Sequence, residues 1–487
     1  MATKLGGLAG DTLIYGLGNG FHRLAQLLTL PIFTSYLAPD EFGTIALLTV
    51  FGLVCRAIFG LGFGISTGIV YFRVAEANAR SAIAKTSFVI AVFASVLLVA
   101  IVLAVAPTLS WLVLGSAEML GVLILFAISA ALQNAVQPTL LRLQFLKQPI
   151  RYVILSTGSA FISVAVALWL VAVEGRGVWG WVEGAVVGGV VGLILGVVFN
   201  RDAIGAAIDW KSARELLRLG LPVVPSFGFM FVVQNSGTYM LQHQASMDQV
   251  GIYSVGLNMG LALGVVVAAF ITAWTPFFQS YATNQKSAPP VFRRVATYYA
   301  IAAGLLACLF FVFAKPAVAL LTEARFHDAY RVVGIAAFSQ FLLGVWSVLL
   351  PGIYFAGKTY LQTVVQGTAA ALVVVLNIVL IPRLGIEGAA LAMALGMLAM
   401  NLLLALVNRM RRFDAMAFSL GPMALIGLAI LPAAAIQRIA DEVLSMVPAT
   451  ATGLTIAAVY AVVGFRLVDG ESRSRLVEIV NGVLRRA

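Results

Sequence analysis

The chain has 487 residues, of which 61% are hydrophobic and only 10% are charged, and its mean hydropathy is +1.01. Soluble globular domains contain about 45–50% apolar and about 25% charged residues. This composition excludes a soluble enzyme, a secreted disulfide scaffold and a disordered protein. The two cysteines, Cys55 and Cys308, both lie in apolar stretches, so we expect two small buried side chains and no disulfide or metal site.

Apolar runs long enough to span a bilayer, which takes about 20 residues, occur along the whole chain. The runs are continuous and not alternating, which predicts an all-α bundle of about fourteen transmembrane helices instead of a barrel. In chain order the predicted spans are 11–37, 42–70, 87–107, 118–141, 152–173, 180–199, 222–245, 250–278, 295–314, 331–354, 362–381, 388–407, 419–436 and 449–466.

The first two predicted spans carry arginines at membrane depth, where ionisable groups are costly and mark functional sites. Arg23 lies near the middle of the first span and Arg56 lies similarly deep in the second. Neither has an obvious carboxylate nearby within the membrane, and the planar guanidinium matches phosphate geometry. We therefore predict a water-filled cationic chamber. A structural arginine that donates to backbone carbonyls, or to Asp11, is the alternative.

Neutral polar side chains accompany these arginines. In the first span they form a stripe with Arg23 on one helical face, within a sector of about 120°. Amide side chains suit hydrogen bonds to sugar hydroxyls, although they serve equally well as bonds between helices. A histidine could also titrate in a proton-coupled cycle. The predicted polar cavity residues are Asn19, His22, Gln26, Gln133, Gln137, Gln234, Asn235, Gln242 and Asn258.

The distribution of Lys and Arg predicts the orientation in the membrane. Most of these residues fall on the side of the N-terminus, the 200–221 connector and the C-terminal tail, so the positive-inside rule places both termini in the cytoplasm. This bias alone accounts for the net charge of +11, and nucleic-acid binding is not needed to explain it. The opposite side holds only Arg176, Lys315, Arg325, Arg331, Arg383 and Arg438.

The sequence also repeats itself at a constant offset of 208 residues. "PDEFGTIAL" around Gly43 returns as "MDQVGIYSV" around Gly251, and Asn200 returns as Asn408. Two six-span halves with the same orientation are typical of transporters that rock two lobes around a central site. The predicted domains are a lobe over 1–201, a connector over 202–221, a second lobe over 222–410, an appended helix pair over 411–466 and a tail over 467–487.

Two polar segments offer little chemistry. In the connector, Ser212 and Glu215 have the spacing of a capping box, which predicts a short interfacial helix, and the tail is also basic and amphipathic. The segment "GIYFAGKT", residues 352–359, satisfies the P-loop pattern, but it ends a membrane helix and its variable positions are bulky. We expect a cytoplasmic turn there, no direct use of ATP and no cofactor.

Several segments together resemble a known family. "LLTLPIFTSYLAPDEFGTIAL", "DQVGIYSVGLNMG" and "LGIEGAALAMALG" ending in "NRMRR" resemble the polysaccharide-exporter branch of the multidrug/oligosaccharidyl-lipid/polysaccharide (MOP) superfamily, and within it the Wzx-type O-antigen and capsule flippases. The resemblance implies export of undecaprenyl-diphosphate-linked oligosaccharides across the inner membrane, alongside polysaccharide polymerases and glycosyltransferases. In the related lipid II flippase, arginines on the first two helices line the cavity, and Arg23 and Arg56 match them by helix and depth. That relative also has an arginine in its eighth helix, whereas 250–278 holds no Lys or Arg.

Two rival functions stay open. A drug or cation antiporter of the same superfamily would need an acidic group in a lobe interior, and only Asp11 and Glu183 are candidates, both near span ends. A membrane enzyme such as a glycosyltransferase would need a sizeable loop or domain with catalytic carboxylates. The longest loops are roughly 20 residues, so we expect a transporter and not an enzyme.

Overall fold

The computed structural model describes residues 29–467 except 75, 147, 205–207, 222–223, 280, 282–286, 357, 359, 412–426 and 428. All regular structure in these residues is helical, and none of them is in a strand, which confirms the predicted all-α class. Within this part of the chain, nine helices are long and apolar enough to cross a membrane, or ten if the bent pair Met247–Gly260 and Leu263–Gln279 forms one span. The number fourteen stays a prediction.

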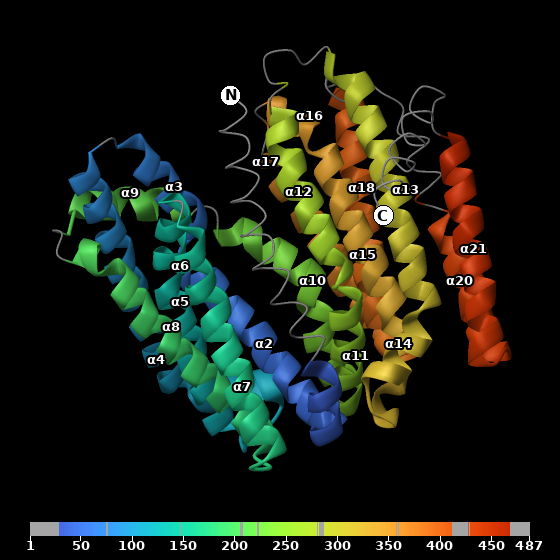
Figure 1. Ribbon diagram of the computed structural model, residues 1–487, viewed down its shortest axis with the longest axis horizontal. Helices are drawn as coiled ribbons and strands as arrows, with labels where there is room; N and C mark the ends of the chain where they lie inside the picture. The colour runs from blue at the N-terminus through green and yellow to red at the C-terminus, as the bar shows by residue number, and fades with distance from the viewer. Residues whose placement is uncertain are drawn as a thin grey trace. The chain divides into compact units, whose positions relative to one another are not determined.

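The chain forms two compact units. Unit 1 comprises Met1–Val255, Thr322–Phe326 and Val374–Ala389, and unit 2 comprises Gly256–Leu321, His327–Val373 and Ala390–Ala487. This grouping leaves the predicted division at residues 201, 222 and 410 as a prediction. Unit 1 contains α2 (Pro39–Phe59), α3 (Phe63–Arg73), α4 (Ala77–Leu114), α5 (Leu120–Phe145), α6 (Pro149–Val153), the π-helical turn η1 (Ile154–Gly158), α7 (Ser159–Ala172), α8 (Gly177–Ile204), α9 (Trp210–Gly220), α10 (Val224–Gln244) and most of α11 (Met247–Gly260) (Figure 1).

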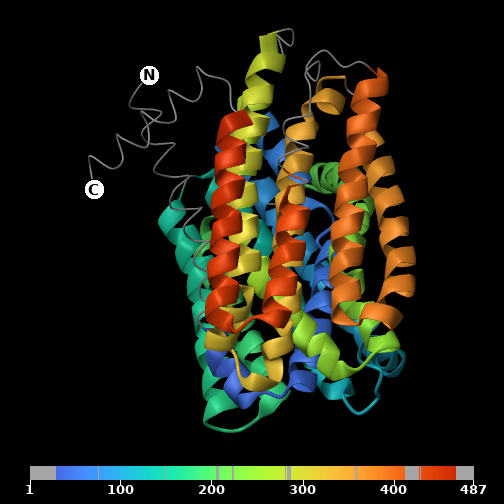
Figure 2. The same ribbon diagram turned by 90° about the vertical axis from the view of Figure 1, so that its right-hand side faces the viewer.

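Unit 2 is built on α12, α13 and α15, and the appended pair α20–α21 packs on α13 (Figure 2). Its helices are α12 (Leu263–Gln279), α13 (Ala288–Val312), α14 (Ala314–Leu321), α15 (Tyr330–Leu349), α16 (Pro351–Phe355), α20 (Ile430–Val443) and α21 (Met446–Leu467). The 3-10 helix η4 (Ala324–Ala329), α17 (Tyr360–Leu384) and α18 (Ile386–Arg411) contribute residues to both units.

Small residues let α7 and α8 pack closely in unit 1. A Cβ added to Gly184 would lie 2.6 Å from the Cβ of Ala167, and one added to Gly188 would overlap the Cβ of Ser163. Helices in membranes gain stability mainly from such close van der Waals packing, because lipid supplies little hydrophobic drive between them. The face of α8 that carries these regularly spaced glycines is therefore its contact surface for α7.

The second predicted span, 42–70, is broken into α2 and α3. Leu61 and Gly62 have φ angles of 51° and 67°, in the left-handed region that ends a helix. A Cβ on Gly62 would lie 2.8 Å from the Cα of Gly220, so α3 and α9 approach each other closely at this elbow. The hydropathy of 42–70 is continuous, and for that reason it does not reveal the break.

Helix α9 lies across the ends of the longer helices of unit 1 (Figure 1). Its N-cap is Asp209, not Ser212 as the capping-box spacing predicted, because the Asp209 carboxylate accepts from the Lys211 N–H (3.0 Å) and from the Ser212 hydroxyl. The Ser212 hydrogen bond, in particular, lowers the pKa of Asp209. Glu215, freed from the cap, pairs with Arg73 of α3 at 2.6 Å.

Within unit 1, α2 and α11 cross at two glycines. A Cβ on Gly43 would lie 3.2 Å from the backbone N of Gly251, and a Cβ on Gly251 would lie 3.0 Å from the N of Gly43 and overlap the Pro39 carbonyl. No side chain larger than hydrogen fits between the helices at either position. The two glycines are the pair that the 208-residue offset relates.

Other matched features occur at the same offset. Gly177 (φ 54°) is the first residue of α8 and faces the Glu41 carboxylate, while Gly385 (φ 56°) precedes α18 and faces the Gln249 side chain, 3.1 Å from the built Cβ. Glu41 and Gln249 are themselves 208 residues apart. The kink of α4 at Val105 also corresponds to the break between α13 and α14 at Phe313. The offset thus relates backbone geometry as well as residue types.

Unit 2 has an aromatic core. Trp274 packs against Phe278 and Phe292 with ring centroids 5.7 and 5.1 Å apart. Its indole N–H donates to the Ser347 carbonyl at 2.9 Å, which satisfies the buried donor. Tyr460 of α21 donates its hydroxyl to the Ala300 carbonyl of α13 at 2.9 Å, and this bond attaches the appended pair.

Candidate functional site: a cation held by amides in unit 1

Arg56 lies in the last turn of α2, directly before the elbow, and it is half-buried. Its Nη1 donates to the Gln133 Oε1 on α5 at 3.0 Å, and the Gln133 Nε2 donates to the Ser129 hydroxyl at 3.1 Å. Ser129 is fully buried. The structure therefore brings together two of the residues predicted for the cavity, Arg56 and Gln133, which are 77 residues apart in the chain.

The next residue on α5 holds the end of α2. Asn134 donates through Nδ2 to the Phe59 carbonyl at 3.0 Å and to the Ser95 hydroxyl of α4 at 3.3 Å. The last carbonyls of a helix have no partner within it, so a side-chain donor there satisfies a group that would otherwise be unpaired. The turn of α2 that carries Arg56 is thus tied to α5 and α4.

The hydrogen-bond acceptor that the structure gives the Arg56 guanidinium is a neutral amide, so this contact does not neutralise the cation. A guanidinium has five N–H donors in a planar fork, and one of them is used by Gln133. The remaining donors suit an oxyanion such as a phosphate. Among the described residues, no group of three or more His, Cys, Asp or Glu side chains could hold a metal ion.

The other predicted cavity residues have varied surroundings. Gln137 and Asn258 are exposed, Gln234 is half-buried, and Asn235 donates to the Phe231 carbonyl of its own helix at 3.1 Å. The side-chain amide of Gln242 lies against Gly115, and its N and O atoms have no hydrogen-bond partner in the described part of the chain. The structure does not join these residues to Arg56. Asn19, His22, Arg23 and Gln26 lie outside the described residues.

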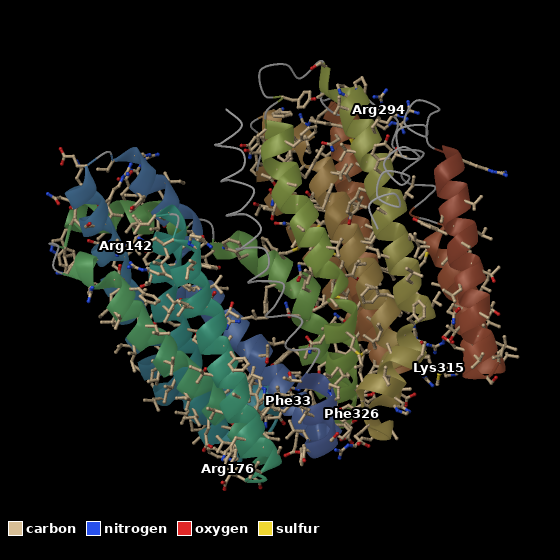
Figure 3. All side chains as sticks on the ribbon, viewed as in Figure 1. Phe33, Arg142, Arg176, Arg294, Lys315 and Phe326 are labelled. Carbon is tan, nitrogen blue, oxygen red and sulfur yellow. The ribbon has the colours of Figure 1, made fainter. Side chains whose placement is uncertain are left out.

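Arg142 is a buried cation that lies one residue beyond the predicted span 118–141. It lies in α5, only 9% of it is exposed, and its Nη1 donates to the Asn200 Oδ1 of α8 at 2.7 Å. Figure 3 shows it toward the α9 end of unit 1, with Arg176 at the opposite end. The predicted span ended at residue 141, one residue too early to include it. Its partner, Asn200, could have been singled out from the sequence, because it recurs as Asn408 at the 208-residue offset.

The long apolar helices define a polytopic membrane protein. The lipid II flippase MurJ in an inward closed conformation superposes with a TM-score of 0.69 at 12% identity, over 93% of this chain and 99% of that one. An inward-facing MATE-family multidrug transporter of the MOP superfamily gives 0.63 at 13% identity, over 80% and 98%. A point mutant of the Vibrio cholerae MATE transporter VcmN gives 0.52 at 15% identity, over 83% and 96%.

These likenesses show that the chain has the fold of the MurJ flippase and of MATE-family transporters, in agreement with the resemblance found in the sequence. Residues 32–331 match the polysaccharide biosynthesis protein family. The chain therefore belongs to this family. No curated protein sequence matches the chain.

Proposed function

We propose that this protein flips undecaprenyl-diphosphate-linked oligosaccharides from the cytoplasmic to the periplasmic leaflet of the bacterial inner membrane. The product would feed the synthesis of a surface polysaccharide such as O-antigen, capsule or exopolysaccharide. Membership of the polysaccharide biosynthesis family and the likeness to a lipid II flippase support the substrate class. The observation that carries the proposal is the Arg56 guanidinium, a cation at membrane depth whose acceptor is uncharged.

A diphosphate explains why such a cation is kept in the membrane. Burying an unneutralised charge costs several kcal/mol, so it persists where a ligand of opposite charge compensates it. Arg56 offers a planar set of N–H donors to phosphate oxygens, while the polyprenyl chain stays near lipid. Arg23 is the proposed second diphosphate ligand. The polar residues Asn19, His22, Gln26, Gln133, Gln137, Gln234, Asn235, Gln242 and Asn258 are the proposed set for the cavity.

Alternating access is the proposed mechanism, and the matched contacts at an offset of 208 residues support the two-lobed repeat behind it. Contacts inside unit 1 also join early segments to late ones. The Arg325 guanidinium donates to the Thr34 carbonyl at 2.9 Å, and the rings of Phe42 and Phe326 meet edge-on with centroids 5.1 Å apart. The cation pattern assigns Arg325 to the periplasmic side. Release of substrate there requires these contacts to open.

The proposal extends to organisation and partners. The segments 1–201, 202–221, 222–410, 411–466 and 467–487 are proposed as lobe, connector, lobe, appended pair and tail, with both termini cytoplasmic. Glycosyltransferases would supply the substrate and a polymerase would consume it. A reporter fused after Arg486 that is active only in the periplasm would contradict this orientation.

The test is a flipping assay in proteoliposomes with undecaprenyl-diphosphate-linked glycans. Arg56→Ala should lower the rate about 10- to 100-fold at normal protein level, the scale of one or two charge-assisted hydrogen bonds. Arg56→Lys should restore activity only in part, because Lys keeps the charge but loses the fork. Arg56→Glu should be worse than Ala. The matched control is Arg201→Ala, since Arg201 is an exposed cation at the end of α8. Wild-type flipping by Arg56→Ala would refute the diphosphate site.

The alternative function is that of an ion-coupled multidrug or cation antiporter, and the structural likeness to MATE transporters supports it. Of its two candidate acidic groups, Glu183 pairs with Arg176 at 2.7 Å, and Asp11 lies outside the described residues. The rival predicts that a cationic drug is exported against an ion gradient and that Arg56→Ala leaves this export intact.

A further inference from the structure

We infer that Gln133 and Asn134, adjacent on α5, are positioning residues that fix the Arg56 guanidinium for a diphosphate. Gln133 does so by accepting from Nη1, and Asn134 by holding the end of α2. Through these two bonds α5 determines how tightly the chain binds its substrate. The inference rests on the proposed function and assigns Gln133 a contact with Arg56 in place of a contact with sugar.

Because position 133 holds an amide and not a carboxylate, the Arg56 guanidinium stays available to bind an anion. Oε1 of a glutamine accepts a hydrogen bond without carrying a negative charge, so it orients the guanidinium and does not neutralise it. A glutamate in the same place would form an ion pair and compete with phosphate. The amide is itself oriented, because the Ser129 hydroxyl accepts from Nε2 and so turns the oxygen of Gln133 toward Arg56.

Asn134 fixes the backbone that carries Arg56. The elbow at Leu61 and Gly62 interrupts the helix, which leaves the Phe59 carbonyl without a helical donor. Asn134 is only 2% exposed, and it supplies that donor at 3.0 Å. The last turn of α2 therefore cannot move away from α5 without unpairing a buried amide, which costs about 1–3 kcal/mol.

The helical frame does not require this network. The positions 208 residues beyond Arg56, Gln133 and Asn134 are Gly264, Phe341 and Leu342, and α12 and α15 pack against each other without a cation or an amide at these positions. If the network served only to join two helices, no cation would be needed, because α12 and α15 are joined without one, by the hydrogen bond from the Trp274 indole N–H to the Ser347 carbonyl. The presence of a cation in the network of α2 and α5 is thus explained by the ligand that Arg56 binds.

The test uses the purified full-length protein with undecaprenyl diphosphate as the probe. Gln133→Glu should keep the protein level and the melting temperature, because the new carboxylate pairs with Arg56. Its affinity for the probe should fall about tenfold or more, equivalent to about 1.4 kcal/mol. Asn134→Leu should lower both the melting temperature and the affinity. The control is Gln362→Glu, the same change at a half-buried position of α17, which should leave the affinity unchanged.

A double variant separates positioning from a direct contact with substrate. If Gln133 acts through Arg56, adding Gln133→Glu to Arg56→Ala should cause no further loss of affinity. Wild-type affinity in Gln133→Glu, or additive losses in the double variant, would overturn the inference. Failure of the proposed function looks different, because Arg56→Ala alone would then bind and flip the diphosphate lipid as the wild type does.

Discussion

In the first half of the chain, α5 meets α2 through Gln133 and Asn134, whereas the corresponding positions of α15 hold Phe341 and Leu342. Phe341 is 1% exposed, and its ring stacks on Tyr299 at 5.8 Å. The same succession of helices thus encloses a polar network in one half and an aromatic core in the other. Some helix bends and one close crossing fall at positions 208 residues apart, while the residues at such positions decide which half carries a charge.

The glycine crossing tests the part that the two halves share, and it should give the largest effect. A Cβ in Gly251→Ala would overlap the Pro39 carbonyl, so α2 and α11 must separate along their crossing. We expect destabilisation at or beyond the upper end of about 1–3 kcal/mol, and loss of flipping. Thermal unfolding of the purified protein measures the first. Gly64→Ala is the control, because a Cβ there has no atom within 4 Å. Equal behaviour of the two variants would contradict the close crossing.

An amide placed at the position of α15 that corresponds to Gln133 should destabilise the aromatic core of the second half. Phe341→Gln removes a buried ring and leaves an amide without an acceptor or donor positioned for it, at a cost of about 3 kcal/mol. The melting temperature should fall markedly. Phe313→Gln, at a position that is 42% exposed, should change it little. An unchanged melting temperature in Phe341→Gln would show that the second half tolerates polarity at this position.

The buried cation of α5 offers a smaller contrast. Asn200→Ala removes the acceptor of Arg142 and should cost about 2 kcal/mol, the scale of a hydrogen bond to a charged group. Replacing Arg142 as well, in Arg142→Met with Asn200→Ala, should recover most of that loss, because no uncompensated charge is then buried. A double variant less stable than Asn200→Ala would show that Arg142 has a further role.

The repeat counterpart of Asn200 should give the smallest effect. Asn408 donates to the Leu349 carbonyl of α15 at 2.9 Å, so the same position bonds to neutral backbone in the second half. We expect Asn408→Ala to cost about 1 kcal/mol in thermal unfolding, less than Asn200→Ala. The reverse order would mean that the charge on Arg142 does not strengthen the first contact.

The sequence predicts helices well here because a bilayer imposes continuous apolar runs, and the all-α class follows from them. The elbow at Leu61 and Gly62 could not be predicted from hydropathy, because both residues are apolar or small and only their φ angles reveal the break. The depth of Arg56 in its span singles it out as a candidate site residue from the sequence alone. Its bond to Gln133 was not predictable, because that bond depends on how α2 and α5 cross. Arg142 was missed for the simpler reason that its span was drawn too short.

The contact between Gly43 and Gly251 has a consequence for the ancestry of the chain. In an isologous dimer, a residue can touch its own copy only where the twofold axis passes between them. Two glycines related by the repeat meet in that way here, each within 3.2 Å of the other's backbone nitrogen by its built Cβ. Fusion of two identical subunits at such a contact would convert an equilibrium between monomers into a permanent intramolecular contact.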